Sequence, residues 1–177
     1  MNTKYKITLW SFSSPLILPI FLFFLMLIVW LKLIIELLND KNYAIIGFIL
    51  VLIIFEIVPS IILQFNYLKI DKNKIIKIDE NKFNIEITQN GKKNVFHFDE
   101  VDRVRMIHSK NYDNVFRGLM PWHTYYFYVI CLKNDDEYIV TRLSVRKLEK
   151  ILNVRIVYKR VFFPYITKIV LNRAINK

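Results

Sequence analysis

Two long apolar runs, separated by only five residues, dominate the first third of the chain. The first, residues 15–38, is interrupted by Lys32 and Glu36, and the second, residues 44–63, has Glu56 as its one charged residue. A bilayer core of about 30 Å is spanned by about 20 helical residues, so each run is long enough to cross. We therefore expect a membrane α-hairpin of two transmembrane helices over residues 15–64, preceded by a flank at residues 1–14.

The distribution of basic residues predicts an orientation for this hairpin. Lys4 and Lys6 precede the first run, four lysines follow the second within residues 69–77, and the intervening loop has only Lys41, beside Asp40. Because cytoplasmic flanks are enriched in Lys and Arg, we expect a multi-pass protein of the cytoplasmic (inner) membrane with both termini cytoplasmic. The single cysteine, Cys131, excludes an intrachain disulfide.

Beyond the second run, the hydrophobic period changes from helical to two. Ile85 and Ile87 alternate with polar neighbours, and Asn90-Gly91 follows, which is the strongest short-range signal of a β-hairpin. The segment Asp99–His108 also fits a helical stripe, so both alternatives stay open there. The full set predicts about seven short strands, at Tyr67–Asp71, Lys74–Asp79, Phe83–Thr88, Val95–Phe98, Val104–His108, Thr124–Leu132 and Glu137–Arg142.

The last part of the chain contains two further amphipathic segments. Ser144 can cap a short helix over Val145–Leu152, whose apolar face we expect to lie on the sheet. The tail, residues 153–177, has no acidic residue, and Pro164 can begin a final helix there. The tail is predicted either to lie at a membrane interface or to dock on the domain.

Three segments indicate a family. They are Tyr67-Leu68-Lys69-Ile70, the strand and acidic corner Phe96–Val101, and the strand Tyr138–Leu143 that leads into Val145–Leu152. Over Phe65–Leu152 the chain resembles bacterial two-span membrane proteins that have a pleckstrin-homology-like (PH-like) domain. The resemblance implies a PH-like β domain at residues 65–152, a barrel of about seven strands with a C-terminal helix.

The resemblance also bears on a ligand site. PH domains that bind phosphoinositides use clustered basic residues in the first strand–loop–strand. Lys69, Lys72, Lys74 and Lys77 lie in that region, but their spacing does not reproduce the family's ligand motif. We therefore transfer no phosphoinositide site to this chain.

Basic residues interleaved with large apolar ones make the loop Ser109–Trp122 our best candidate for a binding surface. The alternative is that its aromatic side chains fold back onto the barrel. Together with the lysines after the second run and the basic tail, this loop predicts a surface for a membrane or a partner. Its residues are Lys69, Lys72, Lys74, Lys110, Phe116, Arg117, Leu119, Met120, Trp122, Lys159 and Arg160.

The ionisable residues of the two apolar runs are a separate candidate site. Lys32, Glu36 and Glu56 would lie inside the membrane, where charged groups are costly and often functional. They predict an ion or proton relay in an oligomer, or else a structural clasp within the hairpin or contacts between subunits of an oligomer.

Signatures of catalysis and of cofactor binding are missing from the sequence. The three histidines, His97, His108 and His123, have no Cys or carboxylate at metal-ligand spacing, and we expect no metal and no cofactor. No nucleophile motif or phosphate-binding glycine loop is present, so we expect no enzyme. The net charge of +11 comes without a nucleic-acid recognition motif, and we expect no nucleic-acid partner.

Three functional hypotheses follow. The first is an integral membrane protein that presents a PH-like binding or scaffolding domain to anionic lipid, with a protein partner or a homo-oligomer also possible. The second is a subunit of an oligomeric ion or proton channel or carrier that uses Lys32, Glu36 and Glu56. The third is an immunity or accessory protein that binds a specific protein partner.

Overall fold

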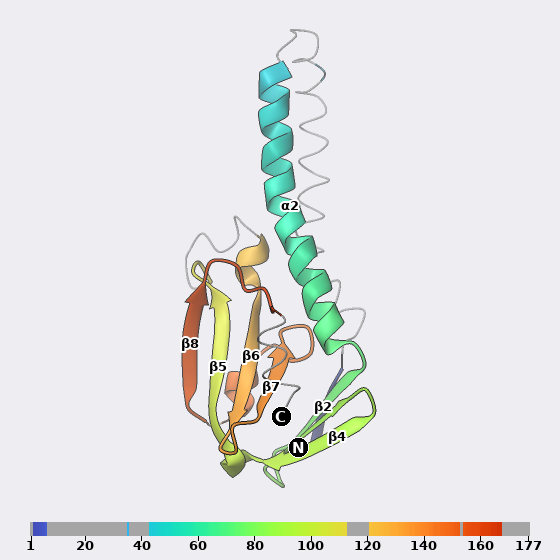
Figure 1. The fold of residues 1–177 in the computed structure, drawn as a ribbon, viewed down its shortest axis with the longest axis vertical. Helices are drawn as coiled ribbons and strands as arrows, with labels where there is room; N and C mark the ends of the chain where they lie inside the picture. The colour runs from blue at the N-terminus through green and yellow to red at the C-terminus, as the bar shows by residue number, and fades with distance from the viewer. Residues whose placement is uncertain (1, 7–34, 36–42, 113–120, 153, 168–177) are drawn as a thin grey trace.

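A computed structural model describes residues 2–6, 35, 43–112, 121–152 and 154–167 of the chain. In this part of the chain two four-stranded β-sheets pack face to face, and a long helix, α2 (Tyr43–Asp71), projects from between their ends (Figure 1). The mostly-β part of the predicted fold is therefore confirmed, but the eight described strands form a sandwich of two sheets and not the predicted barrel of about seven strands.

The first sheet is antiparallel and has the strand order β1-β2-β3-β4. The hairpin between β3 and β4 turns at Asn90 and Gly91, whose φ angles of 50° and 80° are those of a type I′ turn. This confirms the hairpin that Asn-Gly predicts. The strands are β1 (Asn2–Lys6), β2 (Lys74–Asp79), β3 (Asn84–Gln89) and β4 (Lys92–His97).

The second sheet has the order β7-β6-β5-β8 and mixes two kinds of pairing. Strand β5 pairs antiparallel with β6 and parallel with β8, so β8 forms an edge of this sheet. A short 3₁₀ helix, η1 (Phe98–Glu100), connects the two sheets, and a second, η3 (Pro121–Thr124), precedes β6. The strands are β5 (Val101–Ser109), β6 (Tyr126–Leu132), β7 (Glu137–Thr141) and β8 (Ile156–Val161).

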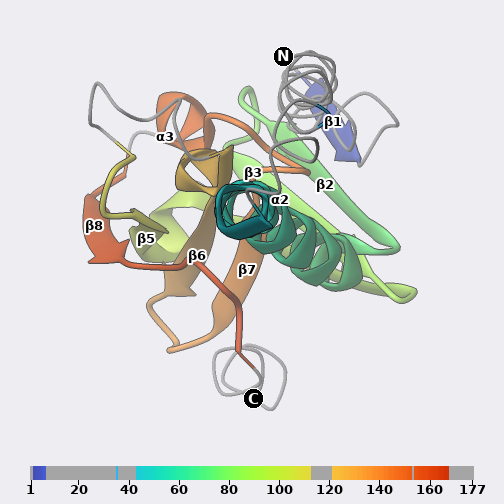
Figure 2. The same ribbon diagram turned by 90° about the horizontal axis from the view of Figure 1, so that it is seen from above.

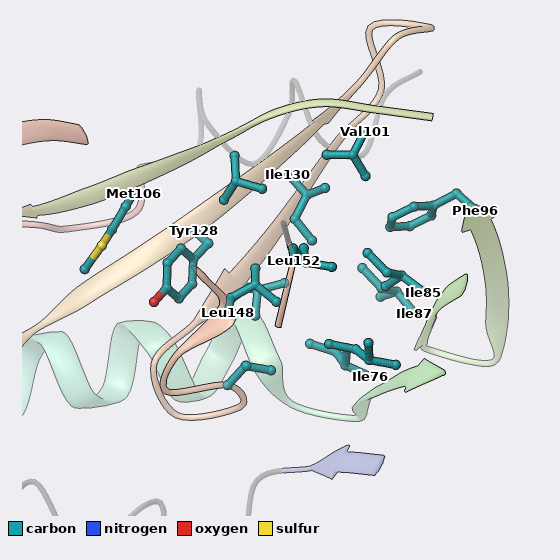
Figure 3. Close-up of a cluster of buried hydrophobic side chains, with 14 of the residues drawn as sticks. Ile76, Ile85, Ile87, Phe96, Val101, Met106, Tyr128, Ile130, Leu148 and Leu152 are labelled. Carbon is teal, nitrogen blue, oxygen red and sulfur yellow. The ribbon is translucent and has the colours of Figure 1, made fainter. Parts of the chain in front are cut away.

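The main hydrophobic core lies between the two sheets (Figure 3). Alternate residues of β2 and β3, including Ile76 and Ile85, face Tyr128 and Ile130 of β6. Phe96 of β4 stacks on Tyr138 of β7 with ring centroids 5.1 Å apart. The one-turn helix α3 (Leu148–Ile151) contributes Leu148, and Val145 and Leu152 beside it are also buried, as the amphipathic pattern predicts.

A second core forms on the other face of β6, where the C-terminal half of α2 packs (Figure 2). Leu63 and Tyr67 of the helix contact the same cluster as Phe127 and Val129 of the strand. All seven residues of β6 are buried because both faces of the strand are covered. Other apolar side chains of α2, on its N-terminal half and on the helix face turned away from this core, are exposed. They include Val51, Ile54, Phe55, Val58, Ile61, Ile62 and Phe65.

The prediction of a two-span transmembrane hairpin is wrong, and so is the inner-membrane localisation derived from it. Within the described residues, no helix has both the length and the apolarity that a bilayer crossing requires. The second run lies in α2. Ser60 and Leu63 at the end of the run, and Gln64 directly after it, are buried, and Leu63 belongs to the hydrophobic cluster beside the second sheet. A long apolar run therefore does not distinguish a membrane span from a helix that packs on protein. The first run, apart from residue 35, lies outside the described residues.

Two predictions of local structure are also wrong. Tyr67–Asp71 is the last part of α2 and not a strand, because Leu63, Tyr67 and Ile70 share the helical face that covers the second sheet. Residues 156–161 of the tail form β8, which the sequence analysis missed. At 99–108 the strand alternative is correct, since β5 follows directly on η1.

The first strand of the fold lies at the N-terminus and was also missed. β1 pairs antiparallel with β2 from Asn2 opposite Asp79 to Lys6 opposite Ile75. The connection between the first two strands of the sheet therefore comprises residues 7–73 and includes α2.

Candidate binding surface

The lysines after the second apolar run do not form one free cationic cluster. Lys69 and Lys72 are exposed at the end of α2. Lys74 is buried, and its ammonium lies 2.9 Å from the carboxylate of Asp71. Lys77 forms an ion pair of 2.8 Å with Glu86 on the neighbouring strand. Two of the four charges are thus neutralised by acidic partners within the fold.

The loop Ser109–Trp122 is described only at its two ends. Lys110 is exposed, whereas Trp122 is 3% exposed and packs between His123 and the rings of Phe162 and Phe163. The other predicted surface residues of this loop, Phe116, Arg117, Leu119 and Met120, lie outside the described residues, as do Lys32 and Glu36. Glu56 lies within α2.

The structure gathers exposed cations and aromatic rings along the edge strand of the second sheet. Tyr158 and Phe162 are 61% and 68% exposed, and the basic side chains around them are exposed as well. No acidic residue follows Glu149 in the sequence. We call this set the β8 surface: Lys110, Arg155, Tyr158, Lys159, Arg160 and Phe162.

Strand β8 is fixed to the fold along its length and at its end. It pairs with β5 from Ile156 opposite Val104 to Val161 opposite Ser109. Beyond the strand, the Tyr67 hydroxyl donates to the carbonyl oxygen of Pro164 at 2.8 Å. The Asn66 side chain accepts from the Ile166 N–H at 2.9 Å and donates to its carbonyl at 3.1 Å. Helix α2 thus anchors the segment that follows β8.

Arg142 is the centre of a largely buried cluster of polar side chains with Tyr125, Tyr126 and Thr124. Its guanidinium lies 5.0 Å from the ring centroid of Tyr125 and 5.8 Å from that of Tyr126. The guanidinium also donates to the hydroxyl oxygen of Thr124 at 2.6 Å. Burial raises the pKa of both tyrosines to about 12, so both hydroxyls stay protonated at neutral pH. The group therefore stabilises the fold by hydrogen bonds and cation–π contacts.

Two surface hollows have a mixed charge that does not favour an anion. One, of about 260 Å³, lies against the first sheet, and its Lys77 and Lys93 both pair with Glu86. The other, of about 210 Å³, includes Asp102, Asp135 and Glu137 in its wall. Among the described residues no group of three or more His, Cys, Asp or Glu is placed to hold a metal ion.

Sequence reasoning found three members of the β8 surface: Lys110 in the loop Ser109–Trp122, and Lys159 and Arg160 in the basic tail. It missed Arg155, Tyr158 and Phe162 because it did not predict a strand there. The β-branched and aromatic residues of Ile156–Val161 (Ile156, Val157, Tyr158 and Val161) are the signal that could have identified the strand.

The comparison with protein families places this fold. The model of the PH-domain family matches residues 2–151, which includes the N-terminal strand β1 and ends before β8. The chain belongs to the PH-domain family. Comparisons with curated proteins and with solved structures find no significant match. Membership of the PH-domain family supports a role in binding or scaffolding. The match also extends the resemblance seen over Phe65–Leu152 to the N-terminal strand β1.

Proposed function

We propose that the protein is a PH-family binding module, and not an enzyme, whose β8 surface binds an anionic partner. The observation that supports this most directly is the concentration of exposed cations on one edge of the second sheet, in a segment without acidic residues. Interfaces favour arginine and aromatic residues, and Arg155, Tyr158 and Phe162 are of these types.

The charge of the β8 surface determines the class of partner. Its basic side chains attract carboxylates or phosphates, and complementary charge raises association rates and rejects cationic partners. Both an acidic protein and the head groups of an anionic lipid surface have this chemistry. The lipid surface is the partner class predicted from sequence, and the protein class agrees with the accessory-protein hypothesis.

Binding of the full-length protein to simple anionic probes tests the proposal. We expect it to bind poly-L-glutamate or phosphatidylserine vesicles at low salt, and to bind neither poly-L-lysine nor phosphatidylcholine vesicles. Affinity should fall steeply as ionic strength rises, because exposed charges are screened over about 10 Å at 0.1 M salt.

Paired charge reversals separate the β8 surface from the general basicity of the chain. The double variant Arg155→Glu/Lys159→Glu should weaken anion binding by about tenfold or more. The control Lys82→Glu/Lys92→Glu has the same net charge but alters two exposed residues elsewhere, one in the turn between β2 and β3 and one at the start of β4. Equal losses in the two double variants, or no binding of any anionic probe, would refute the proposal.

A further inference from the structure

Among the described strands, β8 is the last of its sheet. Within the described part of the chain it pairs with β5 alone, and no described strand lies on its other side. Both overall views show β8 at the margin of the second sheet (Figures 1 and 2). The strand also lies beyond residue 151, where the match to the family model ends.

The hydrogen bonds to β5 reveal which backbone groups of β8 point away from the sheet. The carbonyl oxygens of Arg155 and Val161 accept from β5-side N–H groups, each at 2.9 Å. Because a strand directs the N–H and C=O of alternate residues to opposite edges, the odd-numbered residues of β8 face β5. The N–H and C=O groups of Ile156 and Tyr158 therefore point to the outer edge.

The basic side chains of β8 determine which kind of strand can pair with its outer edge. Lys159 and Arg160 are exposed, and like charges directly opposite each other destabilise a strand pair. A second copy of β8 is therefore rejected, which is a common protection of edge strands against self-association. An incoming strand with acidic side chains gains favourable cross-strand charge pairs instead.

From these observations we propose that the anionic partner is an acidic, extended segment of another protein, which adds to the second sheet as a strand beside β8. Its backbone would pair with the outward groups of Ile156 and Tyr158, and its acidic side chains would lie near Lys159 and Arg155. Backbone pairing provides affinity in this mode of recognition, and alternate side chains provide specificity. The inference rests on the proposed function and specifies the class of partner.

Two peptide probes distinguish strand addition from simple attraction between charges. The first is a ten-residue peptide of alternating Glu and Val, and the second is the same peptide with every backbone amide N-methylated. The second keeps its charge but can donate no backbone hydrogen bond. We expect the full-length protein to bind the first peptide, and the second at least about tenfold more weakly.

A matched pair of variants tests the same point from the side of the protein. Tyr158→Pro removes one outward N–H while leaving the β5-facing donors of β8 in place, and proline is tolerated at such edge positions. Tyr158→Ala removes the same ring but keeps the N–H. We expect Tyr158→Pro to bind the Glu-Val peptide about tenfold more weakly than Tyr158→Ala, with both variants folded by circular dichroism.

The outcomes separate this inference from the proposed function. Equal binding of the two peptides, or equal affinity of the two Tyr158 variants, would overturn strand addition and leave the anion-binding surface standing. Binding of phosphatidylserine vesicles without binding of the Glu-Val peptide would likewise overturn it in favour of a lipid partner. No binding of peptide, poly-L-glutamate or vesicle would overturn both.

Discussion

The carboxylate of Asp71 accepts a hydrogen bond of 2.6 Å from the hydroxyl of Thr141, and this bond joins the end of α2 to the end of β7. The same carboxylate accepts from Ser144 Oγ and pairs with Lys74, whose ammonium also donates to the carbonyl of Ile139. The buried Asp71 carboxylate thus has three partners, Lys74, Thr141 and Ser144. The cluster fixes the long helix to both sheets.

Replacing Lys74 tests the cost of opening this cluster. Lys74→Met leaves the buried Asp71 carboxylate without its cation, and we expect the free energy of unfolding to fall by about 3 kcal/mol. The matched control is Lys77→Met, whose partner is Glu86 in a partly exposed pair. Its expected loss is below about 1 kcal/mol. Urea denaturation measures both, and equal losses would contradict the assignment.

Asn66 anchors the segment after β8, and its two bonds to Ile166 can be separated by mutation. Asn66→Ala removes both bonds, so we expect faster hydrogen exchange at the Ile166 amide. Asn66→Asp retains the acceptor for that amide and should keep most of its protection. Unchanged exchange in the alanine variant would show that the segment is held by other contacts.

Burial of His123 predicts a pH dependence of stability. Burial lowers the pKa of its imidazole below the ordinary value of about 6.5, so the unfolded chain takes up the proton more readily than the folded one. This contribution to stability is present above about pH 6.5 and is lost as the pH falls. Urea midpoints measured from pH 7.5 to 5 should therefore decline less in His123→Gln. An identical decline in the wild-type protein and the variant would contradict the prediction.

The turn at Asn90-Gly91 offers a test of backbone conformation alone. A Cβ at Gly91 would meet no atom within 4 Å, but the residue has a φ of +80°. Gly91→Ala should therefore destabilise the protein by about 1 kcal/mol through strain, without a steric clash. Asn90→Gly, at a φ of 50°, should cost less. A thermal unfolding scan that finds Gly91→Ala neutral would exclude a strained turn.

Local signals in the sequence predicted much of the sandwich, whereas non-local ones did not. The Asn-Gly turn and the alternation of Ile85 and Ile87 depend on adjacent residues, and both are confirmed. Strand β1 forms only because Asn2–Lys6 meets β2, about seventy positions further on, and β8 requires β5 in the same way. The residue types of β8 are typical of a strand, but no local pattern in either segment identifies the strand with which it pairs.

The binding surface shows the same division. Lys159 and Arg160 were predicted from composition alone, but their neighbours Tyr158 and Phe162 join them only once β8 is placed on the sheet edge. The apolar run at 44–63 has the hydrophobicity of a membrane span because it is apolar on all sides of the helix, and only the contacts of Leu63 and Tyr67 reveal that the helix end packs on protein.

The most direct test of the central claim is residue-resolved hydrogen exchange of the full-length protein with and without poly-L-glutamate. If the β8 surface binds anionic partners, protection should rise over residues 155–162 and stay unchanged in β4, which is an edge of the other sheet. Protection that appears in β4 instead, or no change anywhere at a saturating concentration of the probe, would contradict the claim.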